Sequence, residues 1–242
     1  MPIRCSVDHV DKRLKQNQAL KDVTLHFEKG LLHGVIGPDG AGKTTLFRTL
    51  AGLLRPDRGT FQFFEDDEPL PFADARLRMA YMPQQQSLYA DLSISEHLDF
   101  FRDLHRIPSQ VYRERRANLL HMTRLEKFID RPAGKLSGGM YKKLGLMCSL
   151  LQSPDILLLD EPTNGVDPIS RREFWDMLYE FREKKILILI ATAYMDEAER
   201  CDRVHVLNEG HVLADGEPRA LMRESGAETF QAYFLKRIGV TV

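Results

Sequence analysis

Short apolar runs alternate with longer amphipathic stretches along this chain of 242 residues. Runs of Ile, Val, Leu and Phe bounded by Gly, Pro, Asp or Asn are typical of buried strands. They predict strands near 3–9, 23–28, 31–37, 60–64, 79–82, 155–160, 186–192, 203–208 and 211–215. Apolar positions that share a helical face predict helices at 43–53, 93–106, 109–130, 138–151 and 170–184, and the helix from 93 opens with SISE, a capping box.

The order of these elements predicts an α/β fold with a helical insertion. Strands dominate 1–82, helices fill 93–151, and strand–helix alternation then resumes. We expect a single domain over 1–242, with an α/β core at 1–84 and 154–225 and a helical subdomain at 85–153. The core should hold a mixed or parallel sheet with an N-terminal antiparallel part. Residues 226–242 are weakly patterned and predict a small helix or a frayed end.

Composition and charge are those of an ordinary soluble protein. The net charge of −1 gives no indication of a nucleic-acid or anionic-membrane partner. Apolar runs such as ILILIA are far shorter than the roughly 20 residues that span a bilayer, so a membrane role requires another chain or another part of the protein. Three widely spaced cysteines fit a reduced, cytosolic protein with buried thiols.

A phosphate-binding loop follows the apolar strand LLHGVI. Residues 37–44 read GPDGAGKT, the P-loop pattern, and a predicted helix comes next. In such a loop the backbone N–H groups face the phosphates, Lys43 reaches the β and γ oxygens, and the Thr44 hydroxyl ligates Mg²⁺. The predicted phosphate site comprises Gly37, Pro38, Asp39, Gly40, Ala41, Gly42, Lys43, Thr44 and Thr45.

A second motif completes a nucleotide site. Residues 156–161 read ILLLDE, a buried strand that ends in Asp160 and Glu161. In P-loop proteins this Asp holds the Mg²⁺ shell, and a Glu one residue further can orient or deprotonate an attacking water. The alternative, a strand that merely ends in polar residues, is weakened by the P-loop upstream. The two motifs predict a site for ATP and Mg²⁺.

Three further motifs resemble those of ATP-binding cassette (ABC) ATPases. LSGGM at 136–140 is similar to the family signature LSGGQ, with Met140 in place of Gln. YMPQ ends in Gln84, which matches the Q-loop glutamine that touches Mg²⁺ and senses the transport partner. GVDP contains Asp167, which matches the D-loop, and CDRVHVLNEGHVLADGEP at 201–218 resembles the closing hairpin. The resemblance covers nearly the whole chain.

The closest resemblance is to ABC-2 type and drug-export ATPases. It rests on SLYADLSISEHLDFF, GVDPISRREFW and YMDEAERCDRV. RPAGKLSGGM and ATAYMDEAER look most like the first of two ATPase halves in tandem bacterial chains of the YbhF and RbbA kind. The sequence is then expected to be either a whole subunit or one domain of a longer polypeptide.

The resemblance implies a head-to-tail dimer with a second ABC ATPase domain, identical or different. Ser137, Gly138 and Gly139 would donate to the γ-phosphate bound by the partner, and Asp167 would couple the two sites. The helical subdomain would dock on separate membrane-spanning permease segments. This places the domain in the cytoplasm, at the face of the inner membrane, with no nucleic-acid partner.

Three positions depart mildly from the family pattern. Asp39 replaces the usual Asn, where the phosphate cradle is mostly backbone. Leu14 stands 23 residues before Gly37, where the family has an aromatic side chain that stacks on adenine. The loss of stacking costs about 1 kcal/mol, unless Leu14 packs in the core and another side chain meets the base. The change of Gln to Met140 is mild, because the Ser and Gly residues of the signature make the phosphate contacts.

Ala193 is the departure with the largest expected consequence. The family places a His there that contacts the γ-phosphate and helps to place the attacking water beside Glu161. Alanine donates no hydrogen bond, and the loss of such a donor typically costs about 10²–10³ in rate. Three explanations fit: a degenerate half with a competent partner, an engineered change that traps ATP, or a dispensable position because Glu161 is intact.

Three functions compete on this sequence. An exporter ATPase is favoured by Glu161. A regulatory half that binds ATP with negligible hydrolysis is favoured by Ala193 and Leu14. A ribosome-associated ABC ATPase remains open, whereas a DNA-repair role is weak because only 51 residues separate Gln84 from Leu136, too few for the long coiled coils of those members.

Overall fold

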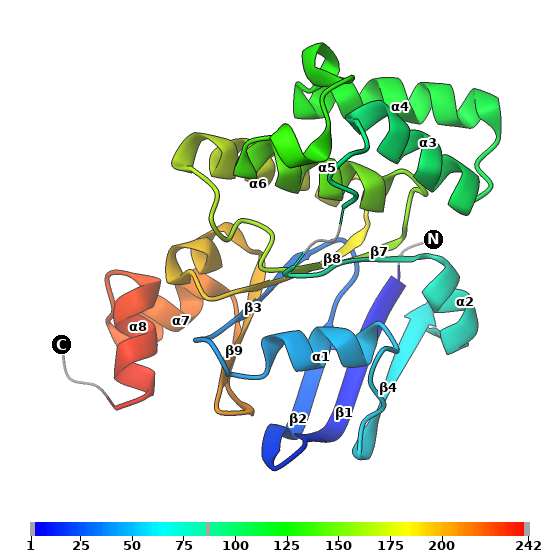
Figure 1. Ribbon diagram of the computed structural model, residues 1–242. Helices are drawn as coiled ribbons and strands as arrows, with labels where there is room; N and C mark the ends of the chain where they lie inside the picture. Colours follow the sequence, from blue (N-terminus) through cyan, green and yellow to red (C-terminus); the bar gives the residue numbers. More distant parts are fainter. Residues whose placement is uncertain (1–2, 86–87, 240–242) are drawn as a thin grey trace.

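The computed structural model describes residues 3–85 and 88–239, and the chain folds into two sheets with helices around them (Figure 1). The strands are β1 (Ile3–Leu14), β2 (Asn17–Phe27), β3 (Leu32–Ile36), β4 (Arg58–Glu65), β5 (Glu68–Leu70), β6 (Met79–Met82), β7 (Ile156–Asp160), β8 (Leu187–Thr192), β9 (Arg203–Asn208) and β10 (His211–Gly216). The helices are α1 (Lys43–Leu50), α2 (Phe72–Leu77), α3 (Ile94–Leu104), α4 (Ser109–Thr123), α5 (Gly138–Leu150), α6 (Pro168–Glu183), α7 (Pro218–Ser225) and α8 (Phe230–Arg237), with 3₁₀ helices η1 (Glu126–Phe128), η2 (Ala133–Lys135) and η3 (Met195–Arg200). None of the helices in these ranges is long and apolar enough to cross a bilayer.

The larger sheet brings together strands that lie far apart in the sequence. Its order is β10-β9-β3-β8-β7-β6, with β10 antiparallel and the other neighbours parallel. The smaller sheet, β2-β1-β4-β5, is antiparallel. The predicted α/β fold, a mixed sheet with an N-terminal antiparallel part, is therefore confirmed. Because β3, β8, β7 and β6 run parallel side by side, their carboxyl ends meet at one edge, where such sheets bind ligands.

The larger sheet is covered on both faces. Successive side chains of a strand point to opposite faces, so Leu157 and Leu159 of β7 join one hydrophobic cluster and Ile156 and Leu158 join the other. Helices α3 to α6 cover the first face, and α1 with the smaller sheet covers the second (Figure 1). Residues of the helical segment and of the sheet thus share one continuous core.

Several element boundaries differ from the predicted ones. β1 continues to Leu14 because it forms a long hairpin with β2. The helix predicted at 109–130 ends at Thr123, where Arg124 turns the backbone left-handed (φ 58°). After Thr192 the chain forms the 3₁₀ helix η3, which is held by side chains of α6. The short elements β5, α2 and α7 were not predicted.

The start of α3 forms as the sequence predicts, and the C-terminal segment contains a helix. Ser93 and Glu96 form the capping box of α3. In the C-terminal segment, Thr229 caps α8 and Phe230 is fully buried, as the small-helix alternative predicts. Residues 240–242 of the predicted tail lie outside the described residues. All three cysteines are buried free thiols, as expected.

Candidate nucleotide site

The phosphate loop joins β3 to α1 at the shared carboxyl edge of the sheet. Gly42 adopts φ 109°, and a Cβ there would lie 2.4 Å from the Ala19 carbonyl oxygen. A Cβ on Gly37 would lie 2.2 Å from the Leu207 carbonyl oxygen. Neither position can accept a larger residue without backbone movement, so the glycines fix the loop against its neighbours.

Lys43 lies at the start of α1, with its ammonium group enclosed by the loop. Its side chain is buried, and Nζ donates to the carbonyl oxygens of Gly37 (2.8 Å) and Pro38 (3.0 Å). Nζ also lies 3.5 Å from Glu161 Oε1. A buried cation requires such partners, and a phosphate group could replace them.

Asp160 ends β7 beside the start of α1. Its Oδ1 accepts from the Thr44 hydroxyl (3.1 Å) and its Oδ2 from the Tyr81 hydroxyl (3.2 Å). Burial raises the pKa of Asp160 above its ordinary value, and the two hydroxyl groups oppose that rise. Because hard cations prefer carboxylate and hydroxyl oxygens, Thr44 and Asp160 fit a Mg²⁺ ion. Tyr81 was not predicted as part of this site.

Glu161 follows Asp160 and enters the site in a left-handed conformation (φ 48°). Its Oε2 accepts from Gln84 Nε2 (2.7 Å) and from Asn164 Nδ2 (3.1 Å). Gln84 therefore contacts the carboxylate, and the backbone carbonyl oxygen of Gln84 accepts from Lys142 Nζ (3.1 Å). Burial lowers the pKa of Lys142, and the nearby charges of Glu161 and Asp160 oppose that effect.

Several of these groups line a cavity of about 370 Å³. Its lining comprises Leu14, Asn17, Ala19, Asp39, Gly40, Gly42, Lys43, Thr44, Thr45, Gln84 and Glu161. Leu14 is exposed at 38%, so the alternative that it packs in the core is wrong. Its side chain instead offers an aliphatic surface at the cavity wall. Asp39 is exposed at the same opening.

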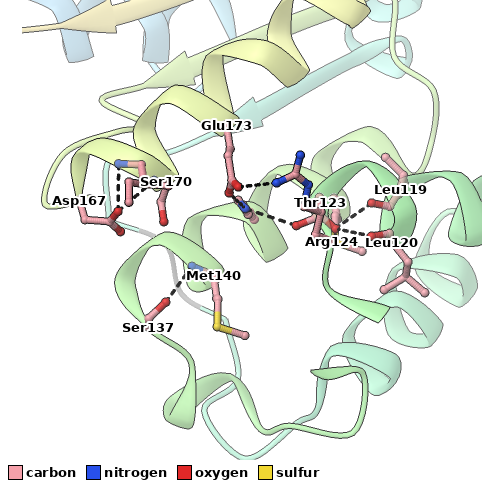
Figure 2. Close-up of polar contacts among 12 residues, drawn as sticks. Leu119, Leu120, Thr123, Arg124, Ser137, Met140, Asp167, Ser170 and Glu173 are labelled. Carbon is pink, nitrogen blue, oxygen red and sulfur yellow. Dashed lines mark hydrogen bonds and ion pairs between the residues drawn. The ribbon is translucent and has the colours of Figure 1, made fainter. Parts of the chain in front are cut away.

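The signature residues lie at the start of α5, and the described lining of the cavity includes none of them. Ser137 caps this helix by accepting from the Met140 N–H (3.3 Å), as Figure 2 shows. Asp167 caps α6 in the same way, through the N–H groups of Ile169 and Ser170. The structure thus brings the signature and Asp167 together with each other, and leaves the phosphate loop apart from them.

The starts of α5 and α6 pack closely. A Cβ on Gly139 would lie 2.5 Å from Ser170 Oγ, so only glycine fits there without a shift. Further along, Glu173 of α6 accepts from Arg124 (2.9 Å), as Figure 2 shows, and also from Lys143 of α5. Steric fit and a partly buried ion pair therefore hold the signature helix against the Asp167 helix.

Ala193 follows β8 at the same carboxyl edge and is half-buried. The next residue, Tyr194, donates its hydroxyl to Asn164 Oδ1 (3.3 Å). Sequence reasoning missed Asn164 and Tyr194. Asn164 is brought back to the site by a turn, because its N–H donates to the carbonyl oxygen of Glu161 three residues earlier (3.3 Å).

A family model described as ABC transporter matches residues 20–164, more than half of the chain. This chain belongs to the ABC transporter family, as an ATPase domain. It is 47% identical over 209 residues to the probable multidrug ABC transporter ATP-binding protein YbhF of Escherichia coli K12, covering 86% of this chain and 36% of that one. It is 36% identical to the Nod factor export ATP-binding protein I of Ralstonia nicotianae, covering 94% and 72%. The chain thus spans little more than a third of the length of YbhF.

Solved structures agree with this ABC assignment. The domain matches the structure of an ATP binding subunit of an ABC transporter with a TM-score of 0.84 and 28% identity, covering 97% and 99% of the two chains. It matches the dimeric ABC cassette MJ0796 with a TM-score of 0.77 and 23% identity, covering 88% and 98%. At that identity the second match supports the fold alone.

Proposed function

We propose that this domain binds ATP with Mg²⁺ and couples its hydrolysis to export through separate membrane-spanning segments. The observation that carries the proposal is that Lys43 and Glu161 line one cavity, while Asp160 accepts from Thr44 of the same lining. Lys43 is placed for phosphate oxygens, Asp160 with Thr44 for the metal, and Glu161 for an attacking water. Gln84, predicted from the sequence to touch Mg²⁺, donates to Glu161 in this structure, and its role at the metal stays a proposal.

The export role rests on the relatives. Their names refer to multidrug transport, Nod factor export and daunorubicin resistance. The chain covers only 36% of YbhF, so the activity of a whole transporter is proposed here and not shown. We therefore place this domain at the cytoplasmic face of the inner membrane, bound to permease segments.

A head-to-tail dimer is proposed from the position of the signature. Ser137, Gly138 and Asp167 are exposed and lie outside the cavity described above. A helix N-terminus is suited to bind phosphate, so α5 can serve a nucleotide held by another domain. The dimeric cassette with the same fold is consistent with this arrangement. Either an identical or a different ABC domain can supply the second half.

Hydrolysis at this site is proposed to be slow because Ala193 offers no donor to the γ-phosphate. Changing Ala193→His should raise the single-turnover rate of radiolabelled ATP by about 10²–10³. The same change combined with Glu161→Gln should give no gain, because the donor needs the carboxylate beside it. Unchanged hydrolysis in Ala193→His, with ATP still bound, would contradict the role given to position 193.

The second candidate function is a regulatory half that binds ATP and closes on a partner with negligible hydrolysis. Ala193 and the exposed Leu14 favour it. Single-turnover measurement separates the two functions, because an exporter ATPase releases phosphate, however slowly, and a regulatory half retains ATP. Co-purification with membrane subunits supports either of these, whereas co-purification with ribosomes supports a ribosome-associated ATPase.

A further inference from the structure

The carboxylate of Glu161 is held by two different kinds of partner. Oε1 faces the Lys43 ammonium group, while Oε2 accepts from the amides of Gln84 and Asn164. The side chain is buried, so its orientation depends on these contacts. Glu161 thus has two amide donors, Gln84 and Asn164, in addition to the Lys43 ammonium group that is placed for phosphate oxygens.

The Asn164 amide has only one orientation that satisfies its neighbours. Its Nδ2 donates to Glu161 Oε2 (3.1 Å), and its Oδ1 accepts from the Tyr194 hydroxyl (3.3 Å). A flipped amide would place Oδ1 against the carboxylate, two acceptors in contact. The hydroxyl of Tyr194 therefore fixes which end of Asn164 meets Glu161.

Tyr194 is itself anchored on the segment that follows β8. Its backbone N–H donates to Thr192 Oγ1 (3.0 Å), and the Arg171 guanidinium lies 4.5 Å from its ring centroid. Arg171 in turn donates to Asp196 and to the fully buried Glu197. Tyr194 is thus held by its backbone bond to Thr192 and by Arg171, which η3 holds in turn, although 38% of the tyrosine is exposed.

We propose that Asn164 and Tyr194 are positioning residues for Glu161, forming a relay from Tyr194 OH through the Asn164 amide to the carboxylate. The inference rests on the proposed function, since it concerns how Glu161 is aimed in ATP hydrolysis. The relay starts one residue after Ala193. It gives this segment a link to Glu161 that does not pass through the missing histidine.

The test compares Asn164→Ala and Tyr194→Phe with matched controls elsewhere. Asn118→Ala removes an exposed amide on α4, and Tyr179→Phe removes a hydroxyl that donates to the Arg200 carbonyl oxygen (3.2 Å). Single-turnover hydrolysis and the Kd for ATP are measured for each. We expect Asn164→Ala to slow hydrolysis about tenfold and Tyr194→Phe about threefold, with Kd unchanged. The controls should match the parent.

A Glu161→Gln background separates positioning from general damage. If the relay acts through the carboxylate, neither substitution slows the residual rate of Glu161→Gln further, and Tyr194→Phe adds nothing to Asn164→Ala. Parent-like rates in both relay variants, or equal losses with and without Glu161, would overturn the relay. If Glu161→Gln itself hydrolyses ATP at the parent rate, the proposed function fails as well. Tyr194→Phe removes a single oxygen. It therefore tests the relay by itself if Asn164→Ala folds poorly.

Discussion

The phosphate-loop side and the signature side of this domain differ in how their polar groups are satisfied. On the phosphate-loop side, Lys43 is 4% exposed, Asp160 is fully buried, and each has partners from other elements. On the signature side, Ser137 and Asp167 are exposed and accept chiefly from N–H groups of the helices they cap. One side is complete within the chain, and the other faces outward.

The difference indicates which half of the chemistry each side can perform alone. Buried charges must be paired inside the chain, so the phosphate-loop side is organised before any ligand arrives. An exposed helix N-terminus keeps N–H groups that a phosphate from outside can use. Binding should therefore survive in an isolated domain, whereas any contribution of the signature requires a second domain.

The largest effect on ATP affinity is expected from a substitution on the phosphate-loop side. Lys43→Ala removes the ammonium group enclosed by the loop, and we expect the Kd for ATP to rise about 100-fold because charge-assisted contacts to phosphate are lost. Fluorescence titration with a labelled ATP analogue measures the change in the isolated domain. Thermal denaturation of the same sample checks that the variant folds.

Lys143→Ala is the matched control, because Lys143 is also buried and ion-paired, but on α5 with Glu173. It should lower thermal stability and leave the Kd for ATP unchanged. Equal losses of affinity in the two variants would mean that folding, and not the phosphate loop, controls binding. The claim that the phosphate-loop side alone binds ATP would then be wrong.

Most of the fold could be predicted from the sequence, because the buried strands carry strong local signals. The runs ILLLDE and ILILI coincide with β7 and β8 of the structure. Ser93 and Glu96 predicted the start of α3. The boundary of β1 was missed because its polar end, near Leu14, is stabilised by pairing with β2 and not by its own pattern. Long-range pairing of this kind leaves little periodicity to read.

The candidate site was predictable only where a motif lies within one short segment. Lys43 and Thr44 belong to one contiguous sequence motif, and the structure places both at the cavity. Tyr81 and Tyr194 reach the site through the sheet order, which brings β6, β7 and β8 side by side. No spacing along the chain encodes that neighbourhood, so these contacts required the three-dimensional structure.

A smaller effect is expected from a substitution on the signature side. Ser137→Ala removes the cap of α5 and should cost about 1 kcal/mol of stability. In the isolated domain the Kd for ATP should stay unchanged, whereas hydrolysis in a dimer with a competent partner should fall. Thr229→Ala is the control, because it removes the equivalent cap of α8. If both variants reduce hydrolysis equally, the signature contributes helix stability and nothing to a bound phosphate.

The smallest effect concerns the edge of the cavity, where the resemblance to the family predicts an aromatic side chain in place of Leu14. Leu14→Tyr restores a ring that can stack on adenine, which is worth about 1 kcal/mol, or about fivefold tighter ATP binding. GTP and ATP should gain alike, because stacking reads the face of the base and not its edge. Leu53→Tyr, at an exposed residue outside the cavity lining, is the control. An unchanged Kd in Leu14→Tyr would place the base away from Leu14, and the phosphate contacts alone would then define the binding mode of the phosphate-loop side.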